Sequence, residues 1–364
     1  MKTAISRKIL SAGEWPLRYN QEMDRKSLVK LTAKGLYCAQ GGFYIDPWKP
    51  VDRAVITHAH ADHASRGNGS YLVTKEGERL CRVRLGNEAK IETAPYGRSL
   101  TIGGVKVSFH PAGHVLGSAQ VRVEYKGESW CVAGDYKLTP DPTCASFEPV
   151  KAQNFITEAT FGLPIYKWQP MEKVFGEVND WWRQNRERGK ASVIFAYSLG
   201  KSQRILKSID PSIGPIFTHG AVERLNEAYR ASGVKLPATT YVGSVEDKKL
   251  FTGSLIVAPP SAQASTWLRR FGPQSTAFAS GWMTVRGARR QRAVDRGFVL
   301  SDHADWPELM TAITAANAER VYVTHGFSDE VTRYLNEQGI ASEKLETKFV
   351  GDDAHETDDG DAAI

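Results

Sequence analysis

Four residues of metal-binding type stand together in the segment HAHADH, directly after the apolar run Ala54–Thr57. The apolar run predicts a strand, so the four residues lie where that strand gives way to a loop. In extended backbone, residues two apart face the same side, so His58 and His60 can hold one ion. Asp62 and His63 then turn toward a second ion. The spacing therefore predicts a two-cation site rather than ordinary surface or core histidines.

Three further residues of metal-ligating type each follow an apolar run. His114 lies in PAGHVLG, Asp135 ends WCVAGD, and His325 ends VYVTH. A loop that follows a strand is where layered folds present functional groups. Taken singly, the histidines have an ordinary reading as hydrogen-bonded loop residues and the aspartate as a turn residue. Their combination with the first cluster favours metal binding for all three.

The elements that must position these residues change in character along the chain. Residues 35–129 show short apolar runs separated by Gly and Pro, which predicts mostly sheet. The middle of the chain predicts helices alternating with strands, at 171–188, 192–197, 201–209, 215–218, 222–231 and 255–258. Beyond it, strands at 297–300 and 320–324 flank a helix at 307–316. The simplest architecture is an α/β metal-binding domain interrupted by a small α/β unit with a parallel sheet.

The length and composition are those of a globular protein. The 364 residues, 41% of them hydrophobic and 24% charged, suit one large domain or two closely joined domains. The four cysteines are widely spaced, which suggests neither a thiolate zinc site nor a disulfide framework. We find no secretory leader and no run of about 18 apolar residues. These features predict a cytoplasmic protein without a membrane span.

The charge of the chain is unevenly distributed. The net charge is +6, but residues 351–364 contain six acids and no Lys or Arg, so residues 1–350 carry a net +12. Such an excess suits a polyanionic partner, because cations that neutralise phosphates release condensed counterions. An ordinary basic protein is the alternative on charge alone. The acidic end is interpreted as a solvated, disordered tail.

The ligand pattern H-x-H-x-D-H, followed by a later His, a later Asp and a final His, resembles the metallo-β-lactamase superfamily. The resemblance implies an αββα sandwich with two metals at its edge. It assigns the first metal to His58, His60 and His114, and the second to Asp62, His63 and His325, with Asp135 bridging. Two divalent cations with a hydroxide between them provide a nucleophile and a clamp on phosphoryl oxygens. Zinc is the first choice for this imidazole-rich set, and manganese is the alternative.

Two more segments narrow the resemblance. FITEAT at 155–160 and LSDHAD at 300–305 resemble the first two signature motifs of the β-CASP group, and His325 falls where the third lies. The group implies an inserted β-CASP domain at 170–298 within a discontinuous metallo-β-lactamase domain at 1–169 and 299–350. It also implies catalytic roles for His303 as general acid, for Glu158 as its partner and for Asp62. Asp302 and Asp305 read instead as helix caps before Pro307.

Nucleic-acid contacts are expected from the insert. A glycine turn opens the helix that carries Lys201 and Arg204, so this turn and its cations could meet a phosphate. A second candidate surface combines an aromatic ring with a run of basic residues, namely Trp282, Arg286, Arg289, Arg290 and Arg292. A solvated loop is the ordinary reading of that run.

Further stretches, including GLYC at 35–38 and GGFYIDP at 41–47, resemble the bacterial DNA-ligase-associated exonuclease family, which is related to Artemis. That resemblance implies DNA end processing and repair, with a DNA ligase and a helicase as partners. A histidine at the third signature, as at His325, is typical of the RNA-processing branch. The leading prediction is a two-metal DNA exonuclease, and an RNA-processing nuclease is the alternative. A small-molecule hydrolase and a non-catalytic nucleic-acid clamp are the remaining classes.

Overall fold

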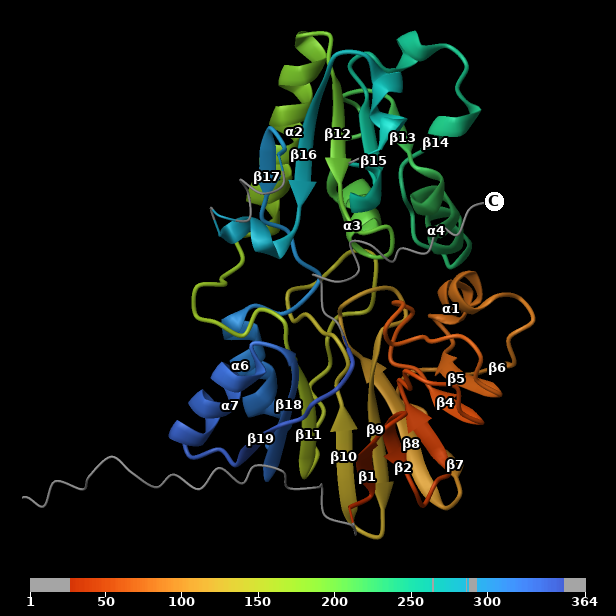
Figure 1. Ribbon diagram of the computed structural model, residues 1–364, viewed down its shortest axis with the longest axis vertical. Coiled ribbons are helices and arrows are strands. Elements are labelled where there is room, and N and C mark those ends of the chain that lie inside the picture. Colours follow the sequence, from red (N-terminus) through yellow and green to blue (C-terminus); the bar gives the residue numbers. More distant parts are fainter. Residues whose placement is uncertain (1–26, 264, 286, 288–292, 350–364) are drawn as a thin grey trace, which may run out of the picture.

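The computed structural model describes residues 27–349, apart from 264, 286 and 288–292. Arg286, Arg289, Arg290 and Arg292, and the acidic end at 351–364, therefore lie outside the described residues. The described chain forms two stacked parts (Figure 1). The lower part contains two sheets with three helices, and the upper part contains one sheet with three helices. The predicted mixed α/β class is confirmed.

The first sheet of the lower part has six strands in sequence order. Its strands are Val29–Thr32 (β1), Gly35–Cys38 (β2), Phe43–Ile45 (β3), Arg53–Val55 (β4), Ser70–Thr74 (β5) and Ile91–Ala94 (β6). Strands β1 to β3 pair antiparallel, whereas β3 to β6 pair parallel. The parallel register brings the carboxyl ends of β4 and β5 to one edge, where the HAHADH segment begins.

The second sheet has seven strands in the order β19-β18-β11-β10-β9-β8-β7. Its strands are Leu100–Ile102 (β7), Val105–Pro111 (β8), Ala119–Tyr125 (β9), Glu128–Val132 (β10), Asn154–Ala159 (β11), Arg320–Gly326 (β18) and Ser342–Lys344 (β19). Strands β10, β11, β18 and β19 run parallel to one another. Strand β18 thus pairs with β11, and this pairing brings His325 next to the FITEAT segment at 155–160.

The two sheets bury their apolar faces against each other. One continuous cluster joins residues of both sheets, including Phe43 and Val55 from the first and Phe109 and Trp130 from the second. Helix α1 (Glu78–Leu85) covers the outer face of the first sheet. Helices α6 (Trp306–Ala316) and α7 (Ser328–Glu337) cover the outer face of the second. Burial of these faces is the main force that holds the layers.

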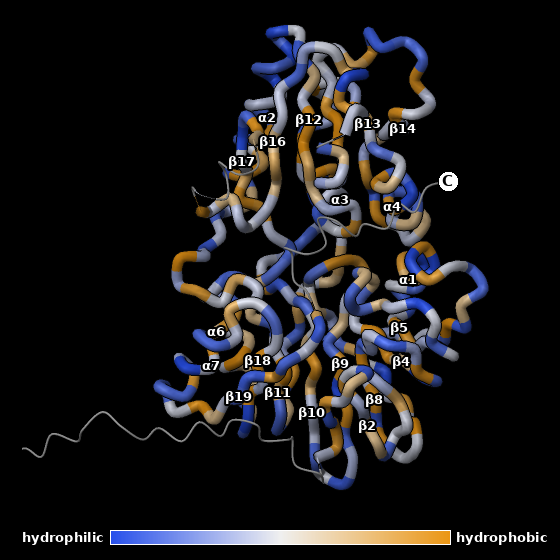
Figure 2. The backbone as a smooth tube through the Cα atoms, viewed as in Figure 1, coloured by the Kyte–Doolittle hydropathy of each residue, from blue (hydrophilic) through white to orange (hydrophobic). Residues whose placement is uncertain are grey.

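The third sheet, in the upper part, is entirely parallel, in the order β14-β13-β15-β12-β16-β17. Its strands are Ala191–Phe195 (β12), Ile216–Thr218 (β13), Thr240–Tyr241 (β14), Leu255–Ala258 (β15), Gln274–Ala279 (β16) and Arg296–Phe298 (β17). Its helices are Met171–Glu187 (α2), Lys201–Ser208 (α3) and Gly220–Ala231 (α4). Every residue of β12 is buried, as expected for a parallel sheet covered on both faces. Figure 2 shows this central strand as a hydrophobic stretch.

Short 3₁₀ helices cover the other face of this sheet through an aromatic cluster that includes Phe251 and Phe271. They run Val242–Ser244 (η1), Lys248–Phe251 (η2), Pro260–Ala262 (η3), Thr266–Phe271 (η4) and Gly281–Thr284 (η5). All four cysteines are free. Burial raises the pKa of the Cys81 and Cys131 thiols to about 12, so both are protonated at neutral pH. Across the described ranges, no helix is both long and apolar enough to cross a membrane.

Candidate metal centre

The loops after three strands of the lower part bring most of the predicted ligands to one point. His58 and His60 follow β4, His114 follows β8, and Asp135 follows β10. Ligand atoms of these four side chains all lie within 4.8 Å of one another. The rings of His58, His60 and His114 meet edge to face, with centroids 4.8 to 4.9 Å apart. Three imidazoles and a carboxylate gathered in this way can hold a divalent cation.

Asp135 also faces a second group of predicted ligands. Its Oδ2 lies 3.5 Å from Nε2 of His58 and 3.5 Å from Nε2 of His63, so one carboxylate oxygen stands between the two groups. Its Oδ1 lies 3.4 Å from Nε2 of His325. His63 Nε2 is in turn 3.4 Å from Oδ2 of Asp62. The structure therefore brings all seven sequence-predicted ligands together around Asp135.

Two buried nitrogens in this cluster indicate whether a cation fits. Nε2 of His58 and Nε2 of His63 are buried, and neither makes a hydrogen bond within the part of the chain that the structure describes. Buried polar atoms almost always have partners, and leaving one without a partner costs about 1–3 kcal/mol. Both nitrogens point at the Asp135 carboxylate. Nitrogen and oxygen donors gathered in this way can bind a divalent cation, which would satisfy them together.

Buried partners orient the imidazoles from behind. Oδ2 of Asp46 lies 2.7 Å from Nδ1 of His63 and accepts the Thr57 hydroxyl at 2.6 Å. The carbonyl of Asp302 lies 2.8 Å from Nδ1 of His114. A partner on one ring nitrogen fixes which nitrogen remains for a metal. His60 differs from the other rings, because its Nδ1 faces Nε2 of His114 at 3.1 Å.

The sequence interpretation missed the role of Asp46. Asp46 adopts a left-handed backbone with φ 44°, and an aspartate tolerates that conformation better than most residues. The residue type at this turn was the local signal in the sequence. This turn places its carboxylate under the HAHADH loop. Gly134 makes a comparable close approach, because a Cβ on it would lie 2.8 Å from the Thr57 hydroxyl. A glycine before Asp135 therefore lets two strand ends meet at the centre.

The carboxylates and imidazoles strongly perturb one another. Burial lowers the pKa of His58 well below its usual range, and the neighbouring His63 adds to this shift. Burial also opposes charge on His63, but Asp62 and Asp135 outweigh it and raise its pKa well above the usual range. Burial opposes charge on Asp135 as well, yet the nearby His63 and His303 hold the Asp135 pKa well below its usual value. Strong mutual perturbation of this kind is typical of functional sites.

His303 and Glu158 form a buried pair beside the ligand groups. Nδ1 of His303 lies 2.9 Å from Oε2 of Glu158, and both side chains are almost fully buried. The other carboxylate oxygen of Glu158 accepts the backbone N–H of Tyr136. The ring of His303 lies 4.7 Å from that of His114. Glu158 stands at an irregularity in the pairing of β11 with β18, and such bulges redirect side chains.

Lys201 and Arg204 do not lie on a surface that could contact a phosphate directly. Both side chains are fully buried. Lys201 Nζ lies 3.1 Å from Asp302 Oδ1, and Arg204 Nη1 donates to the carbonyl of Ser301 at 2.7 Å. A direct phosphate contact would have to break these bonds, so we do not assign one. The glycine turn instead begins α3, whose Lys201 and Arg204 bind the 301–303 loop from the upper part of the protein.

The predicted capping roles divide between the two aspartates. Asp305 caps α6, because its Oδ1 accepts the backbone N–H of Glu308. Asp302 does not cap, since its carboxylate pairs with Lys201 and its carbonyl faces His114. Trp282 is half-buried against Phe161, with ring centroids 4.8 Å apart. Its expected stacking on a nucleic-acid base stays a prediction.

Replacing Lys201 by methionine should destabilise the protein by about 3 kcal/mol, because it leaves the Asp302 carboxylate buried without its cation. The midpoint of urea denaturation measures this loss. Zinc affinity of the folded variant should also fall, since Asp302 holds His114. Lys207→Met on the same helix is the matched control, and Lys201→Arg should recover much of the loss. Equal stability of Lys201→Met and the native chain would contradict this role.

Comparisons with known proteins find relatives with names of nucleic-acid enzymes. No known protein-family profile matches this chain. It is 32% identical over 322 residues to a protein named "Probable DNA ligase" from Opitutus terrae, covering 88% of this chain and 31% of that protein. It is 26% identical over 263 residues to "Endoribonuclease ysh-1" from Neurospora crassa, covering 59% of this chain and 30% of that protein. The chain thus resembles nucleic-acid enzymes, and its His/Asp cluster agrees with the resemblance to the β-CASP group of the metallo-β-lactamase superfamily.

The curated relatives are much longer than this chain. The chain spans about a third of the length of the two curated relatives. One solved structure resembles it with a TM-score of 0.55 and 12% identity, covering 80% of this chain and 78% of that one. It is a protein of unknown function from Enterococcus faecalis. At this identity the likeness shows a shared mixed α/β fold.

Proposed function

We propose that the chain hydrolyses phosphodiester bonds as a two-metal-dependent DNA exonuclease in end processing and repair. The observation that carries the proposal is the Asp135 carboxylate placed between two groups of imidazoles, with a buried His303–Glu158 pair beside them. Two bound divalent cations would supply an activated water and neutralise phosphoryl oxygens. Zinc is the first choice for the resident metal and manganese is the alternative.

The chain's own residues have separate tasks in this proposal. His58, His60 and His114 form one ligand group, while Asp62, His63 and His325 form the other, and Asp135 joins them. Glu158 holds Nδ1 of His303, which leaves the other ring nitrogen to donate a proton to the leaving oxygen. Burial of this pair excludes bulk water and strengthens its electrostatic interaction.

The architecture is proposed in the same terms. Residues 1–169 and 299–350 would form the metallo-β-lactamase domain, an αββα sandwich with the ligands at one edge. Residues 170–298 would form the inserted β-CASP domain. The separate parallel sheet built from strands between residues 191 and 298 supports this division. The two packed sheets with helices on their outer faces support the sandwich.

The choice of DNA over RNA depends on the first relative. A match that covers most of this chain lies within a protein named as a DNA ligase, and a nuclease that trims ends suits a reaction that joins them. A DNA ligase is therefore the proposed pathway partner, and the expected helicase stays a prediction. The alternative is an RNA-processing nuclease, which the relatives named as endoribonucleases and the histidine at 325 favour.

Degradation assays on DNA and RNA of one sequence test this proposal. Labels on the 5′ and 3′ ends report polarity, and zinc or manganese is supplied to the native chain, Asp62→Ala and the exposed control Asp52→Ala. We expect shortened DNA with the native and Asp52→Ala chains and intact DNA with Asp62→Ala. Degradation of RNA alone would select the alternative. Intact nucleic acid with every metal would contradict both and leave a small-molecule hydrolase or a non-catalytic clamp.

A further inference from the structure

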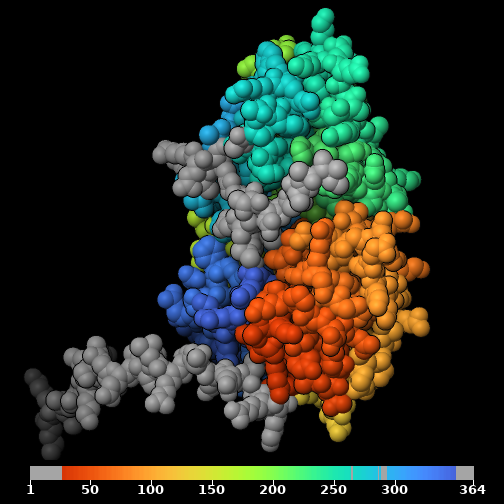
Figure 3. Space-filling view, turned by 45° about the vertical axis from the view of Figure 1, so that its right-hand side comes forward, coloured from red at the N-terminus to blue at the C-terminus, as the bar shows by residue number. Residues whose placement is uncertain are grey.

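A hollow lies beside the metal centre, on the other side of the His60 ring from His114. It lies where the HAHADH loop and α1 of the lower part meet α4 and the β12–α3 loop of the upper part. Figure 3 shows the chain around α1 lying against the chain around α4. His60 lines the hollow, and its Nε2 faces the Leu199 carbonyl at 3.3 Å while its Nδ1 faces His114. The hollow and the ligand cluster therefore share one imidazole.

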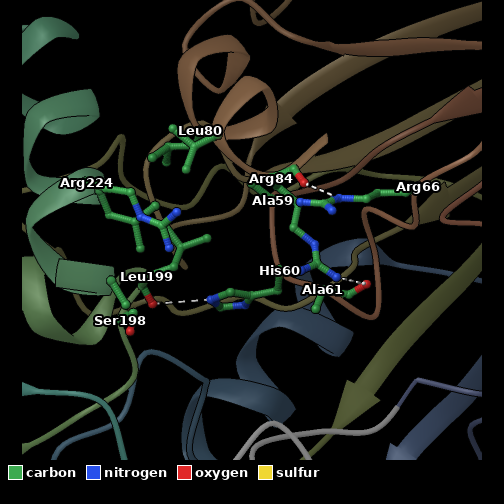
Figure 4. A pocket seen from close by; sticks show the side chains of 12 residues that line it. Ala59, His60, Ala61, Arg66, Leu80, Arg84, Ser198, Leu199 and Arg224 are labelled. Carbon is green, nitrogen blue, oxygen red and sulfur yellow. Dashed lines mark hydrogen bonds between the residues drawn. The ribbon is translucent and has the colours of Figure 1, made fainter. Parts of the chain in front are cut away.

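Three arginines line this hollow, and no acidic residue lines it within the part of the chain that the structure describes. Arg66 follows the HAHADH loop, Arg84 ends α1, and Arg224 lies on α4 (Figure 4). Arg66 and Arg224 are exposed, and Arg84 is half-buried. Guanidinium groups carry their charge at every physiological pH and match phosphate oxygens with paired donors. The hollow is thus a cationic site rather than a neutral crevice.

The arginines are partly held in place by the loop that carries the ligands. Arg66 Nε donates to the carbonyl of Arg84 at 2.8 Å, and Arg84 Nη2 donates to the carbonyl of Ala61 at 3.4 Å. These bonds reduce the conformational entropy that the long side chains would lose on binding an anion. They also tie the position of two cations to the backbone next to His60.

Apart from the arginines, His60 and Ser198, the lining residues are apolar. Leu80 and Leu225 lie on the two facing helices, and Leu80 belongs to a hydrophobic cluster that spans both parts of the protein. The cavity volume of the hollow is about 130 Å³. Sites for small molecules typically enclose about 300–1,000 Å³, so the hollow suits a phosphate group rather than a whole nucleotide.

We infer that this hollow binds a phosphate of the nucleic-acid strand next to the bond that is cut. This inference rests on the proposed nuclease function, because it places the neighbouring phosphate beside the ligand cluster. Arg84 and Arg224 contact the phosphate from two sides, and the Ala61 carbonyl holds the Arg84 guanidinium. The phosphate is either internal to the strand or a terminal monophosphate, since both present the same oxygens.

Binding to chelator-treated protein tests the inference without using cleavage. The probe is a fluorescent single-stranded DNA oligonucleotide, made with and without a 5′-terminal phosphate, and anisotropy gives Kd over a range of salt. The double variant Arg84→Gln/Arg224→Gln should weaken binding at least tenfold. The salt slope should fall by roughly 0.7 for each phosphate of the single strand that the variant no longer neutralises. The matched control is Arg82→Gln, because Arg82 pairs with Glu78 on α1 and is not among the lining residues.

The oligonucleotide ends separate the two sources of phosphate. A loss confined to the phosphorylated oligonucleotide assigns the hollow to a terminal phosphate, and an equal loss with both assigns it to an internal one. Unchanged affinity and salt slope in the double variant would overturn the inference, even if the native chain degrades DNA. If the double variant binds more weakly but the native chain cuts neither DNA nor RNA, the binding site is retained and the proposed nuclease function is rejected. The double variant Arg84→Lys/Arg224→Lys should restore much of the affinity, which separates charge from loss of structure.

Discussion

Replacing Asp135 by alanine should reduce nucleic-acid degradation on the order of 10³-fold or more and remove most of the bound metal. Asp135 is the carboxylate that faces both ligand groups, with its two oxygens directed at His58, His63 and His325. Metal ions stabilise transition-state charge by several kcal/mol, and each 1.4 kcal/mol is about a factor of ten. Metal analysis of the purified chain and the rate of release of labelled nucleotides measure the two effects.

Two further variants separate the charge of Asp135 from its place in the fold. Asp135→Asn keeps the volume of the side chain but loses the negative charge, so its metal content should also fall. Asp52→Ala removes an exposed carboxylate and should change neither quantity. Normal metal content in a folded Asp135→Ala chain would show that this residue does not join the two ligand groups.

Replacing His303 by alanine should lower the rate of DNA cleavage by about 10²–10⁴-fold while the metal content stays at the native value. The reason is that His303 is not part of the proposed ligand set and its Nδ1 lies 2.9 Å from Oε2 of Glu158. A group that protonates the leaving oxygen matters less when that oxygen leaves easily. The loss should therefore be much smaller with a nitrophenyl phosphodiester than with DNA.

The same substrate pair checks Glu158, which positions His303 rather than touching the reacting atoms. Glu158→Gln should give a smaller loss with DNA than His303→Ala, and again a reduced loss with the nitrophenyl ester. An equal loss on both substrates for His303→Ala would contradict a role in proton transfer. A fall in metal content would instead make His303 part of the ligand group around Asp135.

Much of the site follows from the sequence because its residues are of types that seldom gather without a metal. HAHADH has a spacing that already places ligands on both sides of a loop, and His114, Asp135 and His325 each end an apolar run. Parallel pairing then brings those run ends to one edge of the sheets. The sequence also predicts strands and helices in the middle segment, because hydrophobic periodicity is a local property of the sequence.

What the sequence did not reveal depends on contacts between distant segments. Lys201 and Arg204 have the composition of a phosphate-binding turn, but packing of α3 against the 301–303 loop buries both. Arg66, Arg84 and Arg224 are separated by up to 158 positions, and only the meeting of α1 with α4 makes them one surface. Isolated arginines carry no such signal in a basic chain.

The central claim is that two cations held around Asp135 make the chain hydrolyse nucleic acid. The most direct measurement removes metal with a chelator, adds zinc or manganese back in counted equivalents, and follows degradation of labelled DNA and RNA. We expect no degradation without metal and a rate that reaches its maximum near two equivalents per chain. Undiminished degradation after chelation, or a maximum reached at one equivalent, would contradict the two-metal centre.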